Sequence, residues 1–321
     1  MEKFRRMVSE IAYTKDFTKL SLAHRSVIPL LSAVSCLYSV SLSIRHQLYR
    51  LGIFRKNRLP VPVISVGNLT WGGNGKTPMV EFLSLWFSHS GISPLILSRH
   101  VGLSRDLEIV MVNALMSWGN NQVLPLGPLR EPLHALVRAD VVVIHHADLV
   151  SQQNLVNLKL RIQEMKESLP VFFSRMAPSH FFTIEDIHME IPLSAVENRI
   201  LLCVSAIGSP DAFVKCIEKL GPAHVDQLHY SDHYSFQTKD IVAMKKRLEQ
   251  LQHRFGSRPI VVVTEKDYDR DREIFLRLNP FDVLALCSRL KFMSHHESLE
   301  ESFKELVKQL LDGQFERPKI S

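Results

Sequence analysis

Residues 62–78 read Pro-Val-Ile-Ser-Val-Gly-Asn-Leu-Thr-Trp-Gly-Gly-Asn-Gly-Lys-Thr-Pro, and the fold class of the 321-residue chain follows from them. The apolar run Val61–Val66 predicts a buried strand, and a helix is predicted from about Pro78 to His89. Between them lies a glycine-rich loop, Gly72–Thr77. Such a loop between a strand and a helix is typical of the phosphate-binding loop (P-loop) of nucleotide-binding proteins. The sequence therefore predicts an α/β protein that binds a nucleotide.

The residue types of the P-loop fit phosphate chemistry. Glycines let backbone N–H groups approach the phosphates, Lys76 is expected to bridge the β and γ oxygens of ATP, and the Thr77 hydroxyl to bind Mg²⁺. The pattern G-x-x-x-x-G-K-T has one departure, because Thr70 stands where it places its first glycine. ATP and Mg²⁺ are the predicted cofactors. The predicted nucleotide-binding residues of the loop are Thr70, Trp71, Gly72, Gly73, Asn74, Gly75, Lys76 and Thr77.

Two other nucleotide-binding classes fit less well. The dinucleotide fingerprint G-x-G-x-x-G does not match the spacing of Gly72, Gly73 and Gly75, and it gives no role to Lys76. A GTPase reads guanine with T-K-x-D, whereas Thr264–Asp267 reads T-E-K-D, with the lysine and the spacer transposed. A membrane-associated P-loop GTPase and a nucleotide-binding protein without kinase activity stay as alternatives.

The composition is that of a globular protein with a basic surface. The net charge is +6 and the pI about 9.1, yet no reader motif or aromatic–basic interleaving indicates nucleic-acid binding. The four cysteines are scattered without a C-x-x-C pair, which argues against a zinc site and a disulfide framework and suits a reducing compartment. The sequence carries no indication of an oligomeric state.

The N-terminal region combines positive charge with one long apolar segment. No acidic residue lies between Asp16 and Glu81, so this region is expected to attract an anionic membrane surface or an anionic substrate. Within Val27–Ile44 four serines are spaced by three or four residues, which puts them on one helix face opposite a wide apolar face: Ser32, Ser35, Ser39 and Ser43. We therefore predict an amphipathic helix that lies in the membrane interface. A buried core helix and a targeting segment in the first 25 residues are the alternatives.

After the P-loop, apolar strands alternate with helical segments, which predicts parallel sheets, one in each half of the chain. The expected fold class is α/β: two P-loop/Rossmann-like α/β/α domains, joined by a β linker at Val171–Ile191 and preceded by the amphipathic helix. The predicted divisions are a basic leader with the membrane helix at 1–57, a P-loop domain with the linker at 58–190, and a C-terminal α/β domain at 191–321. The further predicted strands are Leu95–Ser98, Leu107–Val112, Val141–Ile144, Ile200–Ile207, Pro259–Thr264 and Phe281–Cys287. The further predicted helices are Asn154–Ser168, one that starts at Ser209-Pro210, Thr238–Phe255 and Glu297–Leu311.

The extended P-loop segment closely resembles that of the tetraacyldisaccharide 4'-kinases, the lipid A 4'-kinases, whose loop also carries threonine in place of the first glycine. Three later segments resemble motifs of this family. Leu126–Pro132 is similar to its G-P-L-R-E-P segment, Asp232-His233-Tyr234 to its D-H-H motif, and Thr264–Asp267 to its T-E-K-D. The resemblance extends from about Ser26 to the C-terminal helix.

The resemblance implies an activity and a place for it. It implies that MgATP phosphorylates the 4'-hydroxyl of an acylated glucosamine disaccharide 1-phosphate, giving lipid IVA, in an active site between two domains at an inner-membrane surface. Asn74, Tyr234 and the basic leader are similar to the plant branch, which implies a mitochondrial protein peripheral to the inner membrane. The implied site residues are Arg130 at the nucleotide, Glu131 with Thr77 at the metal, and His233 with Asp232 for activation of the sugar hydroxyl.

The spacing of two predicted strands conflicts with a parallel sheet. Only Arg99–Asp106 separates Leu95–Ser98 from Leu107–Val112, and a parallel crossover needs a dozen or more residues. A P-loop kinase also uses an apolar strand that runs into an aspartate, which helps to bind Mg²⁺. Here Leu107–Val112 runs into Asn113 instead.

The other candidate strand, Val141–Ile144, runs into His145-His146, a doublet that we expect to be solvated and outside the site.

In the family that the chain resembles, a segment after the strand that matches Leu95–Ser98 supplies the catalytic aspartate and the acidic pair of a D-D-G-x-Q-H motif. This sequence resumes at the last histidine of that motif, which implies a shortened form that lacks an internal segment at Arg99/His100. Loss of a catalytic base costs roughly 10²–10⁴ in rate. We therefore expect weak or absent kinase activity despite the intact P-loop.

Overall fold

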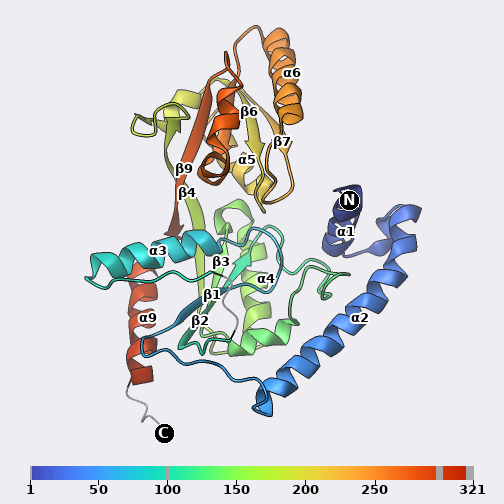
Figure 1. Cartoon of the computed structure of the whole chain (residues 1–321), viewed down its shortest axis with the longest axis vertical. Coiled ribbons are helices and arrows are strands. Elements are labelled where there is room, and N and C mark those ends of the chain that lie inside the picture. The colour runs from blue at the N-terminus through green and yellow to red at the C-terminus, as the bar shows by residue number, and fades with distance from the viewer. Residues whose placement is uncertain (1, 99–101, 294–298, 316–321) are drawn as a thin grey trace. The chain divides into compact units, whose positions relative to one another are not determined.

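The computed structural model describes residues 2–98, 102–293 and 299–315 and is a mixed α/β fold with a nine-stranded, mostly parallel sheet (Figure 1). The chain divides into two compact units, one of residues 1–175 with 292–321 and the other of residues 176–291. The α/β fold class is therefore confirmed. Each unit is described by itself below.

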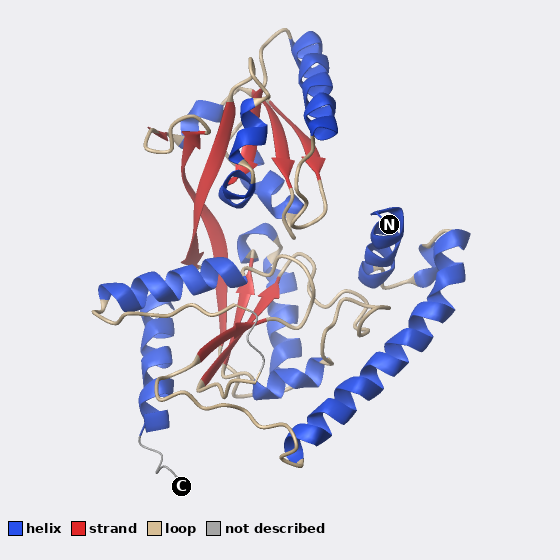
Figure 2. Ribbon diagram, in the orientation of Figure 1, coloured by secondary structure: helices blue, strands red, loops and turns tan. Residues whose placement is uncertain are grey.

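In the first unit, the strands before the long strand β4 pair with one another in parallel. Their carboxyl ends therefore lie at one edge of the sheet, where an α/β protein binds its ligand. The middle two strands are buried on both faces, which explains their nearly unbroken apolar sequence. The strands are β1 (Ile64–Gly67), β2 (Leu107–Asn113), β3 (Val141–His145) and β4 (Val171–Thr183), and the connecting helices are α3 (Lys76–His89) and α4 (Gln152–Gln163) (Figure 2).

The second unit repeats the alternation of strands and helices. Its four later strands are flanked by helices whose apolar faces form one cluster on each side of the sheet. The strands are β5 (Glu190–Ile191), β6 (Ile200–Ser205), β7 (His224–His229), β8 (Ile260–Thr264) and β9 (Val283–Phe292). The helices are α5 (Pro210–Glu218), α6 (Thr238–Phe255), α7 (Glu265–Arg270) and α8 (Arg272–Leu276). Short 3₁₀ helices occur in the whole chain at Phe17–Lys19, Leu133–Arg138, Ala147–Leu149 and Leu193–Val196.

The strands form one sheet in the order β1-β2-β3-β4-β9-β8-β6-β7, with β5 paired to β4. The prediction of a separate sheet in each half was wrong, because β4 and β9 are long enough to have residues in both units. The last helix, α9 (Leu299–Phe315), groups with the first unit, where Phe303 packs against Phe82 of α3 and Phe172 of β4. The predicted division at residue 190 therefore differs from the division by internal contacts.

The predicted strand Leu95–Ser98 is wrong. These residues have no regular structure, and Leu95 is 84% and Ile96 59% exposed. They lie in the loop between α3 and β2, and β1 pairs directly with β2 through the α3 crossover. The short connection from Leu95–Ser98 to β2 therefore does not have to be a parallel crossover, and the conflict is removed. Within the described sheet β1 has β2 as its one neighbour, so it is an edge strand. The junction at Arg99/His100 lies outside the described residues.

The N-terminal region consists of α1 (Glu2–Tyr13) and a long helix, α2 (Leu22–Arg50), which Ser21 caps by accepting a hydrogen bond from the N–H of His24. Ser35 is buried and faces the protein, whereas Ser43 of the same predicted stripe is exposed. By length and composition α2 could cross a membrane, and only 17% of its most apolar window is buried, so it is not a buried core helix. Its exposed apolar residues are Leu22, Leu30, Val34, Leu37, Val40 and Ile44.

Candidate functional site

The P-loop has the backbone geometry that its glycines predict. Gly72 has φ of 95° and Gly75 has φ of 79°, a left-handed conformation that favours glycine. Gly75 is also the N-cap of α3, so the positive end of this helix follows the loop directly. A Cβ atom on Gly75 would lie 2.5 Å from the ring of His145. The loop therefore needs glycine for its backbone and for its contact with the strand below it.

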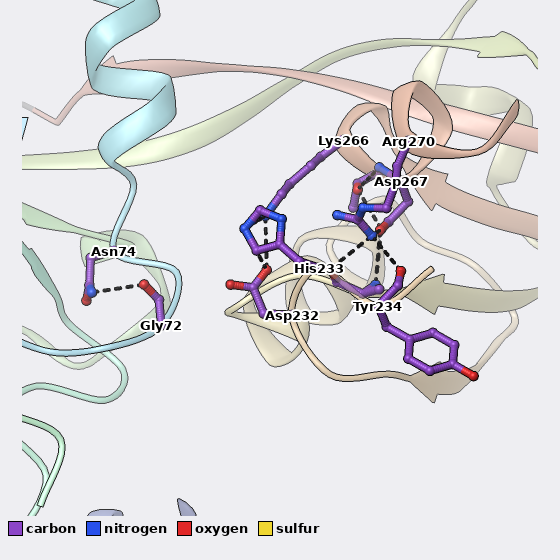
Figure 3. Close-up of polar contacts among 10 residues, drawn as sticks. Gly72, Asn74, Asp232, His233, Tyr234, Lys266, Asp267 and Arg270 are labelled. Atoms are coloured by element: carbon purple, nitrogen blue, oxygen red, sulfur yellow. Dashed lines mark hydrogen bonds and ion pairs between the residues drawn. The ribbon is translucent and has the colours of Figure 1, made fainter. Parts of the chain in front are cut away.

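Asn74 holds the loop from inside (Figure 3). This side chain is buried, and its Nδ2 donates hydrogen bonds to the carbonyl oxygens of Gly72 at 3.1 Å and Thr70 at 3.3 Å. The Thr70 hydroxyl, where the usual pattern has glycine, donates to Oδ1 of Asn74 at 3.2 Å. Thr70, the one departure from the usual P-loop pattern, thus contacts Asn74, and together they fix the loop's shape.

The doublet at the end of β3 was wrongly predicted to be solvated. His145 is 1% and His146 8% exposed, because β3 is covered on both faces up to its last residue. Burial holds the pKa of His145 well below its ordinary range, with the neighbouring His146 as a further cause. Burial also lowers the pKa of His146 to about 4. His145 is therefore a neutral imidazole against Gly75, and its Nδ1 lies 3.0 Å from Oγ of Ser174. The signal for its burial was the uninterrupted apolar run before it.

The segment Leu126–Pro132 lies beside the residues that lead into the P-loop. The Arg130 N–H donates to the Leu69 carbonyl at 2.6 Å, and the Trp71 N–H donates to the Pro128 carbonyl at 3.0 Å. Thr70 and Leu129 form an antiparallel bridge between these two hydrogen bonds. The main chain of Arg130 therefore lies beside the residues that lead into the P-loop, and its role at the nucleotide stays a prediction.

Glu131 has a different neighbour from the one predicted. Its carboxylate forms an ion pair with Arg138, and no cluster of three His, Cys, Asp or Glu side chains suited to a metal occurs in the described residues. Thr77, in the first turn of α3, offers one hydroxyl for Mg²⁺. The loop thus fits a phosphate, whereas the described residues do not assemble the carboxylates that a Mg²⁺ ion usually takes. The assignment of Glu131 as a metal ligand stays a prediction.

The N-terminal helices contact this site through the same loop segments. On α2, the Ser35 hydroxyl donates to the Val123 carbonyl at 2.9 Å and the Tyr38 hydroxyl donates to the Arg130 carbonyl at 2.8 Å. On α1, the Tyr13 hydroxyl donates to the Trp71 carbonyl at 3.4 Å, and burial raises the pKa of Tyr13 to about 12. The helix predicted to meet the membrane is therefore bonded to the segment that pairs with the P-loop.

In the second unit, the predicted pair Asp232 and His233 forms a cluster with Lys266 (Figure 3). Lys266 Nζ lies 3.0 Å from Oδ1 of Asp232 and 3.5 Å from Nε2 of His233, and the carboxylate and imidazole are 3.9 Å apart. The His233 side chain is 70% exposed, so it can meet a substrate. Sequence reasoning missed Lys266 as a member of the cluster, although the T-E-K-D motif contains it.

Asp267 of the same motif is fully buried and holds the turn that carries His233. It accepts hydrogen bonds from the Thr264 hydroxyl at 2.7 Å, from the Ala206 N–H at 3.2 Å, and from Arg270 at 2.9 Å. Arg270 also donates to the Tyr234 carbonyl at 3.1 Å (Figure 3). A carboxylate engaged in this way cannot read a guanine base, which argues against a GTPase.

Comparisons with known proteins agree on one family. Its sequence model, described as tetraacyldisaccharide-1-P 4'-kinase, matches residues 27–99 and 100–308. The "probable tetraacyldisaccharide 4'-kinase, mitochondrial" of Arabidopsis thaliana is 41% identical over 391 residues, which cover 98% of this chain and 99% of that protein. The tetraacyldisaccharide 4'-kinase of Syntrophus aciditrophicus is 25% identical over 393 residues, with 97% and 99% coverage. The crystal structure of LpxK from Aquifex aeolicus in complex with ATP has a TM-score of 0.55 at 21% identity, over 89% of this chain and 99% of that one, which shows a shared fold.

The same comparisons support a missing internal segment. The family match is split between residues 99 and 100, at the predicted junction. The alignment with the Arabidopsis protein has 391 positions against the 321 residues of this chain, so at least 70 residues of that relative have no counterpart here.

Proposed function

The chain belongs to the tetraacyldisaccharide 4'-kinase family, and from this premise we propose that it binds ATP and directs its γ-phosphoryl group to the 4'-hydroxyl of an acylated glucosamine disaccharide 1-phosphate. The product of this transfer is lipid IVA, in lipid A biosynthesis. The single observation that carries the proposal is the intact P-loop geometry of Gly72–Thr77 within the region that the family model matches.

The first unit supplies the nucleotide site in this proposal. The N–H groups of Gly72–Gly75 and the amino end of α3 bind the phosphates, and Lys76 neutralises the β and γ oxygens. Thr70 and Asn74 fix the loop, and Arg130 extends the positive surface beside Trp71. Bound Mg²⁺ would add charge neutralisation, with Thr77 as the proposed ligand and Glu131 as a second once it leaves Arg138.

The second unit supplies the acceptor side. The His233 imidazole takes the proton of the 4'-hydroxyl as the oxygen forms its bond to the γ-phosphorus, and the bond from that phosphorus to the β,γ-bridging oxygen breaks to leave ADP. Asp232 and Lys266 orient the imidazole and balance its charge. The exposure of His233 supports this role, since a base has to reach the hydroxyl.

The internal gap lowers the expected rate. In this proposal the residues missing between Arg99 and His100 include the aspartate that would assist His233 and the acidic pair that would hold Mg²⁺. Loss of a base costs roughly 10²–10⁴ in rate. The chain is therefore a slow kinase compared with a relative that has the segment. The second candidate, favoured by the same gap, is a nucleotide-binding protein that does not transfer phosphate.

We propose that the N-terminal helix α2 attaches the protein to a membrane. The exposed apolar face of α2, flanked by basic residues, lies in an anionic membrane interface, where the lipid substrate is also found. The similarity to a protein named as mitochondrial supports peripheral attachment to the mitochondrial inner membrane. We further propose that each unit is a three-layer α/β/α domain of the P-loop/Rossmann type, and that nucleic acid is not a partner.

A single assay separates the two candidates. The purified chain is incubated with labelled ATP and tetraacyldisaccharide 1-phosphate, beside the full-length Arabidopsis relative and the Lys76→Ala variant of the chain. ATP binding that depends on Lys76, with transfer that is slow and lost in His233→Ala, supports the kinase. ATP binding with no transfer supports the second candidate. A chain that binds no ATP contradicts both.

A further inference from the structure

Asn113 ends β2 at the place where a P-loop kinase has a metal-binding aspartate, yet its contacts are those of a different role. Its side chain is 1% exposed. Oδ1 accepts hydrogen bonds from the N–H groups of Leu115 at 2.9 Å and Met116 at 3.4 Å. Because only the amide oxygen can accept from these donors, the nitrogen end is fixed on the other side. Nδ2 therefore donates to the carbonyl oxygen of Gly73 at 2.8 Å.

We propose that Asn113 is a positioning residue of the nucleotide site, which holds the Gly73 peptide and so points the loop's N–H groups toward the phosphates. The inference rests on the proposed nucleotide binding. Gly72 and Gly75 are conformationally free, so the peptide between them needs a partner to keep one orientation. The Asn113 amide supplies that partner from the sheet below. In this chain the position serves the loop and not a metal ion.

The neighbouring strand supports the loop at a second point. Asn113 and His145 are partners in the β2–β3 register, and the His145 ring lies against Gly75. The ends of two adjacent strands therefore contact the loop at two of its glycines, one through a hydrogen bond and one through ring packing. The His145 ring contacts Gly75, whereas the Gly73 carbonyl accepts a hydrogen bond from Asn113.

Replacing Asn113 by aspartate separates the two roles. An ionised carboxylate puts a negative oxygen against the Gly73 carbonyl and repels it, whereas a protonated carboxyl donates to that carbonyl as the amide does. A metal-ligand position behaves in the opposite way, because its carboxylate strengthens the binding of MgATP. The sign of the change in nucleotide affinity of Asn113→Asp, and the way this change depends on pH, therefore decide between the positioning role and the metal-ligand role.

The experiment measures the dissociation constants of ATP and ADP from pH 5.5 to 8, in EDTA and in Mg²⁺, each relative to the unchanged chain at the same pH. We expect Asn113→Asp to weaken both nucleotides by about tenfold at pH 8, with and without Mg²⁺, and to recover toward the unchanged chain at pH 5.5. Asn113→Leu, which has no donor at any pH, is expected to lose a similar factor with no recovery. The matched control is Asn157→Asp, the same charge change on an exposed residue of α4, with no effect on either nucleotide.

Two results overturn the inference. One is a gain in MgATP affinity over ATP in EDTA for Asn113→Asp, and the other is unchanged affinity in Asn113→Leu. If Asn113→Asp does not fold at pH 8, the affinity of Asn113→Leu for nucleotides decides in its place. Competition by inorganic tripolyphosphate then reports phosphate binding by the loop alone, because it has no nucleoside. Absence of ATP binding by the unchanged chain contradicts the proposed function itself, and this inference with it.

Discussion

The hydroxyl of Tyr38 donates a 2.8 Å hydrogen bond to the carbonyl oxygen of Arg130. Tyr38 lies on α2, the helix with the exposed apolar face, and the Arg130 N–H donates to the carbonyl of Leu69, which precedes the P-loop. Tyr38 thus connects the helix proposed to meet the membrane with the segment that lies beside the P-loop. Attachment of α2 to a surface would therefore affect the P-loop through the Tyr38 side-chain hydrogen bond and the backbone hydrogen bond from Arg130 to Leu69.

Removing the Tyr38 hydroxyl is expected to loosen this connection. Tyr38→Phe leaves the Arg130 carbonyl without that donor, and a lost hydrogen bond costs about 1 kcal/mol. We expect a corresponding fall in the free energy of unfolding in urea and ATP binding weaker by a few fold. Tyr49→Phe on the same helix is the control, since its hydroxyl makes no hydrogen bond within the described ranges. Equal effects of the two variants would contradict the role of Tyr38.

The exposed face of α2 is expected to carry membrane binding. Leu37 is 68% exposed, and Leu37→Glu puts a charge where an apolar side chain would enter the interface. We expect binding to anionic vesicles to weaken by on the order of tenfold, since burial of a leucine contributes about 1.5–3 kcal/mol. The unfolding free energy should stay within about 0.5 kcal/mol. Vesicle flotation measures the binding. Val242→Glu, at a residue of α6 that is 65% exposed, should leave flotation unchanged.

Gly75 and Gly91 form a matched pair for the P-loop. Both have φ of 79°, but a Cβ atom on Gly75 would lie 2.5 Å from the His145 ring, whereas one on Gly91 would meet nothing within 4 Å. Alanine at Gly91 should therefore cost only the strain of the left-handed backbone, about 1–2 kcal/mol. Gly75→Ala should cost more than that and abolish ATP binding. Urea unfolding and calorimetric titration with ATP test this, and equal costs at the two sites would contradict the close packing of the loop on β3.

The buried histidines are expected to make stability depend on pH. Burial lowers the pKa of His146 to about 4 in the folded chain, whereas an unfolded histidine titrates near 6.5. Between these values the unfolded state binds more protons, so stability is fully present above about pH 6.5 and falls as the pH drops toward 4. The loss from this one residue is on the order of 3 kcal/mol.

Substitution of His146 isolates this contribution. His146 has φ of 60°, a conformation that asparagine tolerates, so His146→Asn keeps the backbone while it removes the titrating group. We expect the slope of unfolding free energy between pH 6.5 and 4.5 to become smaller, with His145 among the groups that cause what remains. His253→Asn, at an exposed residue of α6, should keep the full slope. An unchanged slope in His146→Asn would show that another group causes the acid sensitivity.

The P-loop, the strands around it and the Asp232–His233 pair could be predicted from the sequence because each depends on local pattern or motif. The burial of His145 could not, because it depends on which elements cover both faces of β3. The partner of Glu131 was missed for a similar reason: Arg138 comes back to it through a short 3₁₀ helix that local periodicity does not indicate. The prediction of a strand at Leu95–Ser98 was wrong for the opposite reason. Its apolar run has the sequence of a strand, but a strand also needs neighbours, and no strand within the described residues pairs with it.

Restoring the missing segment should convert Leu95–Ser98 into a strand and raise activity. The segment of at least 70 residues that the Arabidopsis relative carries is inserted between Arg99 and His100. We expect the insertion variant to transfer phosphate at least about 10² faster, the lower range for regaining a catalytic base. Labelled ATP and the tetraacyldisaccharide 1-phosphate measure the rate.

Leu95 tests whether the structural change accompanies the gain in rate. In the present chain Leu95 is 84% exposed, so Leu95→Lys should change the unfolding free energy by no more than about 0.5 kcal/mol. In the insertion variant the same substitution should cost about 2–5 kcal/mol, because the leucine then lies in a covered strand. A gain in rate with Leu95 still tolerant of lysine would mean that the segment supplies catalytic groups without completing the sheet. A loss of unfolding free energy in Leu95→Lys without a gain in rate would mean that the segment completes the sheet but supplies no catalytic groups, which contradicts the catalytic role assigned to it.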